Sequence, residues 1–404
     1  MTQLVEEEEF NCVPRRKLPQ SKQEEEKKGP NSESINAGGN LFIPTGCSVL
    51  NLALSNRVDG GYGSGRVVNI IGDSHAGKTI LALTGLAEMS VDTQWEEYQL
   101  LFSDVERALS FDIERLFGKR LKQRLDAGWE EEAEINGLEG YTPPVTIQEF
   151  YQRILKRIQS GRPFIEVLDS FDSLTSSEEV DRADALRDKG KEAGSYKMEK
   201  ARWASEVFRV ISSGLSNTGS LLIVISQTRD NIDPIGFQKK TRSGGKALEF
   251  YSSHIFWLSK LKSIVQGTKP KQIKVGRHVA AKITKTKLTG YEGEVHFPVY
   301  RQIGIDDIGA SIDFLLEWSP RWKKVNNLKK ETPKIKTDKK DKDKEPKENK
   351  VCCEELGLQG GFKSVCTKAE KHRQEIQEHL QEAWDEYLSA ADIGRSSRFS
   401  DCDY

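Results

Sequence analysis

Residues 66–90 constrain the fold of this chain more than any other stretch. An apolar run leads into a loop, and a segment with apolar residues at helical spacing follows it. The loop consists of Gly72, Asp73, Ser74, His75, Ala76, Gly77, Lys78 and Thr79. It matches G-x-x-x-x-G-K-[ST], whose glycines let backbone N–H groups turn toward a polyphosphate at the positive end of the following helix. We expect Lys78 to reach the β- and γ-phosphates and Thr79 to hold Mg²⁺.

The chain has 404 residues, 36% hydrophobic and 30% charged, which is enough for one large α/β domain with flanking tails. Its formal net charge is −1, so affinity for nucleic acid has to come from local basic segments. The cysteines show no repeated C-x-x-C spacing, which favours reduced thiols over a zinc site. No apolar run approaches the ~18 to 20 residues of a membrane span, and the acidic start is unlike a signal peptide. We therefore expect a soluble, intracellular protein.

Composition divides the chain into four segments. Residues 1–40 alternate acidic and basic clusters and are expected to be disordered or to form a short N-terminal segment. Residues 41–326 carry the patterned core, and the lysine-rich residues 327–350 are expected to be a flexible linker. Residues 351–404 form a tail with one amphipathic helix, indicated by Ile376, Leu380, Ala383, Trp384, Tyr387 and Leu388 at 3.6-residue spacing. That helix docks either on its own domain, the simpler alternative, or on a partner protein.

Several short apolar segments of the core end in polar residues. Residues 99–106 end in carboxylates, residues 164–169 end at Asp169 in the manner of a Walker B strand, and residues 220–227 end at Gln227. Strand ends beside a phosphate-binding loop are where α/β folds present catalytic groups. Glu166 is unexpected in the middle of a central strand. Later strands are expected at residues 254–258, 279–287 and 295–303. All of these segments together predict an α/β fold with a largely parallel central sheet flanked by helices.

Two polar segments within the core are expected to be loops. Residues 176–200 are charged with little patterning, which is typical of a mobile loop or lid. Residues 228–246 place basic side chains around one aromatic residue and flexible glycines, which suits contact with a nucleic-acid backbone and stacking on bases. An ordinary solvated loop is the alternative. The candidate residues here are Arg229, Phe237, Lys239, Lys240, Arg242, Gly244, Gly245 and Lys246.

Seven motifs in family order resemble RecA, the family of ATP-dependent homologous-recombination proteins, in its divergent phage-encoded form. They are the phosphate-binding loop and residues 44–54, 102–109, 167–170, 222–227, 243–251 and 283–287. The similarity runs from about residue 43 to residue 305 and covers neither tail. It implies a RecA-like P-loop NTPase core, ATP and Mg²⁺ as cofactors, and single-stranded and double-stranded DNA as partners. It also implies self-association into a helical filament in the cytoplasm of a bacterium or a phage-infected host.

The resemblance assigns roles to single residues. Glu106 corresponds to the catalytic glutamate that positions the attacking water, and Asp169 joins Thr79 in the Mg²⁺ site. Gln227 corresponds to the γ-phosphate sensor at the root of the second DNA loop. Two lysines correspond to residues that reach the ATP of the neighbouring subunit, so that hydrolysis requires assembly. The implied catalytic set is Glu106, Lys78, Gln227, Lys285 and Lys287.

For DNA, the resemblance matches the two polar loops to the family's DNA-binding loops, with Phe237 as the aromatic residue of the second. Arg202 and Arg209 match arginines that contact the phosphate backbone from the helix after the first loop. The phosphate-binding loop departs from the family at Asp73 and at residues 75–76. Residues 1–40 show no counterpart of the N-terminal element through which the family's protomers join.

The resemblance predicts a DNA-dependent ATPase that binds single-stranded DNA as a filament and promotes homologous pairing and strand exchange in recombination and repair. A RecA-fold helicase or translocase is one alternative. A recombination mediator that binds ATP and DNA with little turnover is another. The C-terminal tail is a candidate contact for a single-strand-binding or mediator protein.

Overall fold

The computed structural model of the protein describes residues 41–109, 112–182, 199–230, 240–242, 245–267, 271–325 and 350–390. Contacts divide the chain into residues 1–39 and residues 40–404, and all described residues belong to the second unit. The predicted N-terminal segment, nearly all of the predicted linker and the last residues of the tail therefore lie outside the described residues.

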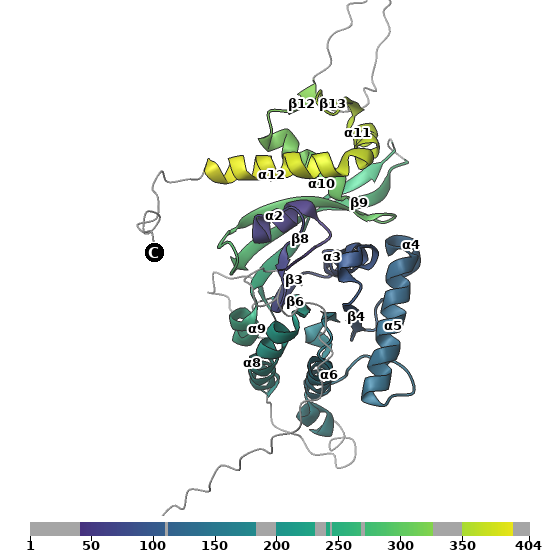
Figure 1. The fold of residues 1–404 in the computed structure, drawn as a ribbon, viewed down its shortest axis with the longest axis vertical. Coiled ribbons are helices and arrows are strands. Elements are labelled where there is room, and N and C mark those ends of the chain that lie inside the picture. Colours follow the sequence, from purple (N-terminus) through teal and green to yellow (C-terminus); the bar gives the residue numbers. More distant parts are fainter. Residues whose placement is uncertain are drawn as a thin grey trace, which may run out of the picture. The chain divides into compact units, whose positions relative to one another are not determined.

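Nine strands of the described chain form one central sheet in the order β11-β10-β9-β8-β3-β6-β5-β4, with β7 paired to β6 (Figure 1). The parallel strands are β3 (Arg66–Gly72), β4 (Gln99–Asp104), β5 (Phe164–Asp169), β6 (Leu221–Asp230) and β8 (His254–Gln266). The antiparallel strands are β7 (Lys240–Arg242), β9 (Ile273–Thr286), β10 (Gly293–Tyr300) and β11 (Gly304–Ile305). The predicted α/β core with a largely parallel sheet is confirmed.

Helices cover both faces of this sheet because its central strands are apolar on both sides. Successive residues of β6 point to opposite faces of the sheet, so Ile223 belongs to one core and Val224 to the other. The first face carries α2 (Ser48–Ser55), α3 (Lys78–Val91), α4 (Ile113–Phe117), α5 (Lys119–Asn136) and α10 (Asp307–Trp318). The second face carries α6 (Ile147–Ser160), α8 (Glu199–Thr218) and α9 (Gly245–Tyr251). Smaller elements are β1 (Phe42–Ile43), β2 (Tyr62–Gly63) and the 3₁₀ helices η1 (Thr93–Trp95), η2 (Phe171–Ser173) and η3 (Glu370–His372).

Local sequence sets the ends of α6. The Thr146 hydroxyl accepts from the Glu149 backbone N–H at 3.1 Å, and the Glu149 carboxylate accepts from the Val145 N–H at 2.9 Å. The first bond satisfies a donor that a helix leaves without a partner in its first turn, and the second fixes the chain just before the N-cap. Gly161 ends the helix in the left-handed conformation at φ 74°.

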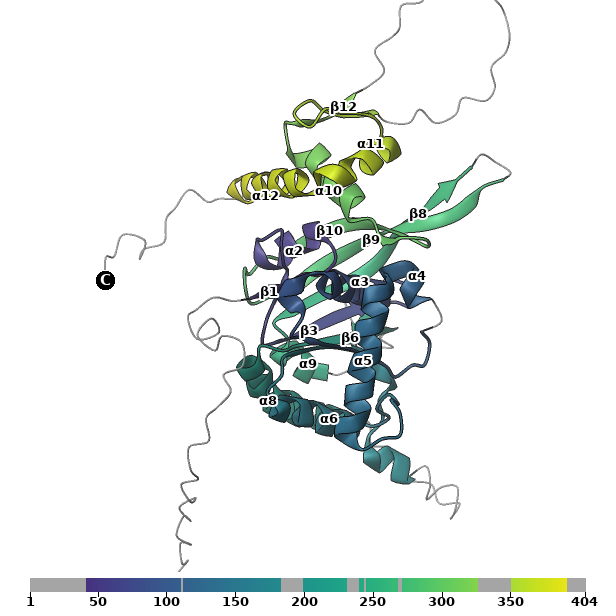
Figure 2. The ribbon, with the colours of Figure 1, turned by 45° about the vertical axis from the view of Figure 1, so that its right-hand side comes forward.

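Strands β8 and β9 are longer than the segments expected at 254–258 and 279–287. They continue beyond the sheet as a two-stranded ribbon (Figure 2). From Ser259 onward almost all of β8 is exposed. A strand with one buried side alternates buried and exposed residues, and this exposed part of β8 does not, so the extension was missed.

The described part of the tail packs on the core. Strands β12 (Trp322–Val325), β13 (Lys350–Cys353) and β14 (Leu358–Gly361) form a small antiparallel sheet, followed by α11 (Phe362–Ala369) and α12 (Arg373–Ser389). The predicted amphipathic segment is α12, which lies against α10 (Figures 1 and 2). Trp384 is 1% exposed, and its indole N–H donates to Asn56 Oδ1 at 3.1 Å. The apolar face of α12 is thus covered by its own domain, whereas the strands and α11 were not predicted.

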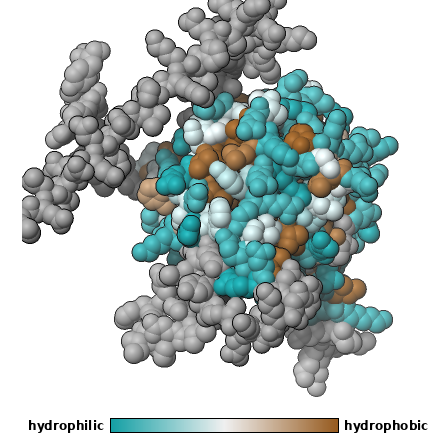
Figure 3. All heavy atoms as spheres, turned by 90° about the horizontal axis from the view of Figure 1, so that it is seen from below, coloured by the Kyte–Doolittle hydropathy of each residue, from teal (hydrophilic) through white to brown (hydrophobic). Residues whose placement is uncertain are grey.

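Seen from below the view of Figure 1, the described surface is mainly hydrophilic, with apolar side chains in small separate groups (Figure 3). Among the helices of the described ranges, none is both long and apolar enough to cross a membrane.

Candidate nucleotide site

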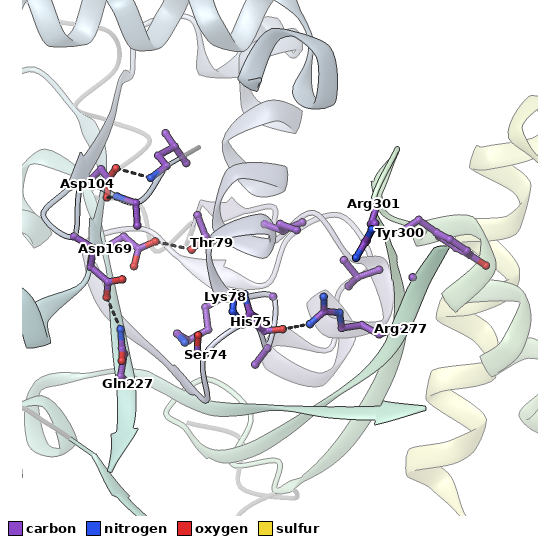
Figure 4. Close-up of a pocket in the computed structure, with 18 of the residues that line it drawn as sticks. Ser74, His75, Lys78, Thr79, Asp104, Asp169, Gln227, Arg277, Tyr300 and Arg301 are labelled. Carbon is purple, nitrogen blue, oxygen red and sulfur yellow. Dashed lines mark hydrogen bonds between the residues drawn. The ribbon is translucent and has the colours of Figure 1, made fainter. Parts of the chain in front are cut away.

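A cavity of about 370 Å³ opens beside the start of α3 (Figure 4). One side, which we call the loop wall, comes from the loop after β3 and from the segments at the ends of β4, β5 and β6. It consists of Ser74, His75, Ala76, Gly77, Lys78, Thr79, Ile80, Asp104, Glu106, Ala108, Leu109, Asp169 and Gln227. The other side, the strand wall, comes from β9 and from β10 with its following turn. It consists of Lys274, Gly276, Arg277, Val299, Tyr300 and Arg301.

The predicted strand, loop and helix are present as β3, residues 73–77 and α3. Gly72 is required because a Cβ there would lie 2.6 Å from the Leu258 carbonyl oxygen. Gly77 precedes α3 in the left-handed conformation, at φ 98°, so a side chain there would be strained. The first N–H groups of α3 have no partner within the helix and face an anion that binds at this end.

Lys78 is only 8% exposed and lies inside the curve of the loop. Its Nζ donates to the carbonyl oxygens of Gly72 at 2.8 Å and of Asp73 at 2.9 Å. Burial lowers the pKa of Lys78, while nearby carboxylates, that of Asp169 first among them, oppose this shift. The lysine is therefore positioned for a phosphate that enters the loop.

Thr79 and Asp169 meet at the floor of the cavity, where Thr79 Oγ1 donates to Asp169 Oδ2 at 2.6 Å (Figure 4). Burial raises the pKa of Asp169 to about 6, and the hydrogen bond from Thr79 opposes this shift. A hydroxyl and a carboxylate oxygen are hard ligands that suit Mg²⁺, which usually keeps several waters and phosphate oxygens. Within the described ranges no cluster of three or more His, Cys, Asp or Glu residues could hold a metal. These two residues fit Mg²⁺ that arrives with a polyphosphate.

Glu106 and Gln227 also touch in this cavity. Glu106 Oε1 accepts from Gln227 Nε2 at 2.6 Å and from Ser170 Oγ at 2.5 Å. The Gln227 backbone N–H donates to Asp172 Oδ2 at 2.7 Å. The structure thus brings the predicted glutamate and the predicted sensor into one hydrogen-bonded group beside the magnesium candidates.

The predicted lysine pair, with Lys285 on β9 and Lys287 directly after its end, does not line this cavity. Lys285 Nζ donates to the carbonyl oxygens of Glu249 and, at 3.2 Å, of Phe250, and Lys287 Nζ donates to that of Phe250 at 3.4 Å. Both lysines therefore lie at the carboxyl end of α9, where backbone carbonyls attract cations. Phe250 beside them is 71% exposed.

The candidate DNA residues that the structure describes lie on two helices, α8 and α9, and two strands, β6 and β7. Arg202 and Arg209 are exposed on α8, and Lys246 is exposed in the first turn of α9, which begins at Gly245. In the other segment, the backbones of Arg229, Lys240 and Arg242 belong to the antiparallel ladder of β6 and β7. Three candidates lie outside the described residues: Phe237, Lys239 and Gly244. Of the first predicted loop, residues 177–182 are helical and residues 183–198 also lie outside them.

The strand wall was missed by the sequence analysis. Arg277 Nη1 donates to the His75 carbonyl oxygen and so joins β9 to the phosphate-binding loop (Figure 4). His75 has φ 60°, a left-handed conformation that non-glycine residues adopt rarely. The Tyr300 phenol points away from the loop (Figure 4), and burial and the nearby Asp306 raise its pKa. Polar residues near the end of a predicted strand were the only signal for Tyr300 and Arg301.

Glu166, which had no partner at the level of sequence, belongs to a buried network. Its carboxylate accepts from Ser103 Oγ at 2.6 Å and from Arg157 Nη1, while Arg157 Nε donates to Glu132 at 2.5 Å. Burial raises the pKa of Glu166, and Arg157 opposes that shift. The network joins α5, α6, β4 and β5 behind the loop wall.

Comparison with known proteins gives one family and several relatives. The family model of the RecA N-terminal domain matches residues 148–306, a range that includes β5, β6, α9 and β9. The proteins named RecA from Rhodococcus jostii (strain RHA1) and Mycobacterium sp. (strain KMS) are each 29% identical over 275 residues, or 68% of this chain and 70% of theirs. RecA of Leifsonia xyli subsp. xyli (strain CTCB07) is 26% identical over 275 residues, or 68% of each chain.

Proposed function

Because the chain belongs to the RecA family as a divergent member, we propose that it is a DNA-dependent ATPase and recombinase. It binds single-stranded DNA as a filament and promotes homologous pairing and strand exchange. The observation that carries this proposal is the single cavity that contains Lys78, Thr79 and Asp169 together with the Glu106–Gln227 pair. A site that only bound a polyphosphate would not need the Glu106–Gln227 pair.

ATP fits the cavity with its phosphates at the start of α3. Lys78 exchanges its two loop carbonyl partners for phosphate oxygens, and its buried charge stabilises the transferring phosphoryl group. Thr79 and Asp169 would hold Mg²⁺, which would supply positive charge to neutralise the β- and γ-phosphates. Glu106 orients the attacking water, because phosphoryl transfer depends mainly on positioning and electrostatic stabilisation.

Gln227 connects this chemistry to DNA. Its side chain donates to Glu106, while its own strand continues into the β6–β7 ladder that carries candidate DNA residues. When the γ-phosphate leaves, Gln227 exchanges hydrogen-bond partners and the ladder takes a different position. The basic residues of the ladder and of α8 supply sequence-independent contacts to the DNA backbone.

Self-assembly is supported by the region at the carboxyl end of α9. Lys285 and Lys287 lie outside their own cavity, next to Phe250, which is 71% exposed. Aromatic side chains are enriched at interfaces between protein subunits, so Phe250 is a candidate contact for a second copy of the chain. We propose that the lysines complete the nucleotide site of that copy, where they stabilise charge on the phosphates.

The direct test is ATP hydrolysis with and without single-stranded DNA, combined with electron microscopy of the same samples. DNA-stimulated turnover on helical filaments is the expected result. Closed rings would instead indicate a helicase or translocase. DNA binding with almost no turnover would indicate a mediator.

Lys285→Ala tests the role of assembly. This substitution is expected to spare ATP binding and to reduce turnover with DNA to the level measured without DNA. Lys323→Ala, which removes an exposed lysine from β12, is the matched control and keeps normal stimulation. Normal stimulation in Lys285→Ala would contradict the assignment of this lysine to a neighbouring site.

A further inference from the structure

The phosphate-binding loop contacts β6 directly through the side chain of Asp73. In the parallel pairing of β3 and β6, Gly72 lies opposite Gln227. The next residues along the two strands are Asp73 and Thr228, and Thr228 Oγ1 donates to Asp73 Oδ1. The register of the sheet therefore places this pair beside the cavity, although neither residue lines it.

The end of β6 is thus held on two sides. Successive side chains of a strand point in opposite directions, so Gln227 reaches Glu106 while Thr228 reaches Asp73. Thr228 is also the first residue of β6 that pairs with β7, opposite Arg242. One threonine consequently contacts the phosphate-binding loop through its side chain and the candidate DNA ladder through its backbone.

Asp73 is an unusual residue in a loop that binds phosphates, because its carboxylate carries the same sign of charge as the ligand. The bond from Thr228 keeps one carboxylate oxygen turned toward β6, and Asp73 does not line the cavity. The carbonyl of the same residue accepts from Lys78 Nζ at 2.9 Å. When Lys78 turns to a phosphate, the Asp73 backbone loses a partner, and any movement of this residue acts on Thr228.

We propose that Asp73 and Thr228 are positioning residues that couple nucleotide occupancy to the β6–β7 ladder and thereby to DNA affinity. This inference rests on the proposed function, since it specifies how that site communicates with DNA. It differs from the role of Gln227, which responds to the γ-phosphate through Glu106 inside the cavity. The Asp73–Thr228 pair instead transmits the position of the phosphate-binding loop to β6.

The measurement is the affinity for a fluorescent oligothymidylate, with and without a non-hydrolysed ATP analogue, at fixed salt. The ratio of the two affinities defines the coupling. Thr228→Val keeps the size of the side chain and removes the donor, so we expect the ratio to fall about tenfold, the effect of one hydrogen bond to a charged group. Thr228→Ser keeps the hydroxyl and is expected to retain the ratio.

A double-mutant cycle separates coupling from damage to the fold. Asp73→Ala is expected to lower the ratio at least as much as Thr228→Val, and the double variant no further than Asp73→Ala, because both substitutions remove the same bond. Unchanged coupling in Thr228→Val, or losses that add, would overturn the inference while leaving the proposed function intact. If the DNA affinity of the wild-type protein is the same with and without the ATP analogue, both this inference and the proposed function are overturned. Should Thr228→Val fail to fold, the Asp73→Asn variant, whose amide oxygen still accepts from Thr228, is compared with Asp73→Ala.

Discussion

The loop wall and the strand wall enclose one cavity but are built in different ways. The loop wall gathers side chains from the ends of parallel strands, and several of them are hydrogen-bonded to one another, as in the Glu106–Gln227 and Thr79–Asp169 pairs. The strand wall draws its side chains from antiparallel strands, and Arg277 joins it to the loop through the His75 carbonyl. The loop wall is therefore arranged for chemistry, whereas the strand wall is arranged to hold the loop and its ligand.

The substitution expected to change activity most removes a residue of the loop wall. Lys78→Ala removes the buried cation at the start of α3, and we expect turnover to fall about 1,000-fold, together with loss of ATP-dependent assembly. Hydrolysis assays and sedimentation with the ATP analogue measure the two losses. Retained turnover would show that the cavity is not the reaction site.

Glu106→Gln is expected to lower turnover about 100-fold while nucleotide affinity changes by less than about threefold. The amide keeps the size of the side chain and can still accept a hydrogen bond, but it cannot serve as a base for water. Turnover and binding of a fluorescent ATP analogue distinguish the two quantities. If the affinity for nucleotide fell as much as turnover, Glu106 would contribute to binding rather than to catalysis, and the two walls would not differ in function.

Arg277→Ala should have the opposite signature. Loss of a charged hydrogen bond to the loop is expected to raise the dissociation constant of ATP about 5- to 10-fold, with turnover at saturation lowered by less than about twofold. Arg277→Lys keeps the charge and serves as the control. If turnover at saturating ATP fell while the affinity for ATP stayed the same, the strand wall would take part in catalysis.

The smallest effect is expected at Tyr300. Its phenol points away from the phosphate-binding loop (Figure 4), so Tyr300→Phe should change affinity and turnover by less than about twofold. Tyr300→Ala also removes the ring that packs near Gly276 and is the informative comparison. A strong effect of Tyr300→Phe would show that the hydroxyl turns into the cavity when nucleotide binds.

The difference between the walls also explains what the sequence could predict. A loop with fixed spacing and polar residues at the ends of apolar strands point to one edge of a parallel sheet, which is why Lys78, Asp169 and Gln227 were found. Arg277 and Arg301 are brought in by the pairing of antiparallel strands. That pairing depends on register and on exposed strand extensions, which leave no local pattern.

Two further contacts were not predicted, and only the first of them left no signal in the sequence. Thr228 meets Asp73 only because Gly72 lies opposite Gln227, a register that no single strand specifies. The partner of Glu166 did leave a signal, since Arg157 falls on the buried side of α6 that also carries Ile154. A basic residue on an apolar helix face and an acidic residue in a central strand each indicate a buried partner, and together they indicate each other.

Val325 and Lys350 lie opposite each other across the β12–β13 ladder, although the lysine-rich segment separates them in sequence. The last described residue before this segment and the first one after it therefore lie side by side in the fold. Doubling the length of such a segment adds only about 0.6 kcal/mol of closure entropy. A protease cut within it would leave two pieces held by the ladder and by the packing of α12 on α10. This position is accordingly a natural point for inserting a tag, a fluorophore or a whole second domain without disturbing either wall of the cavity.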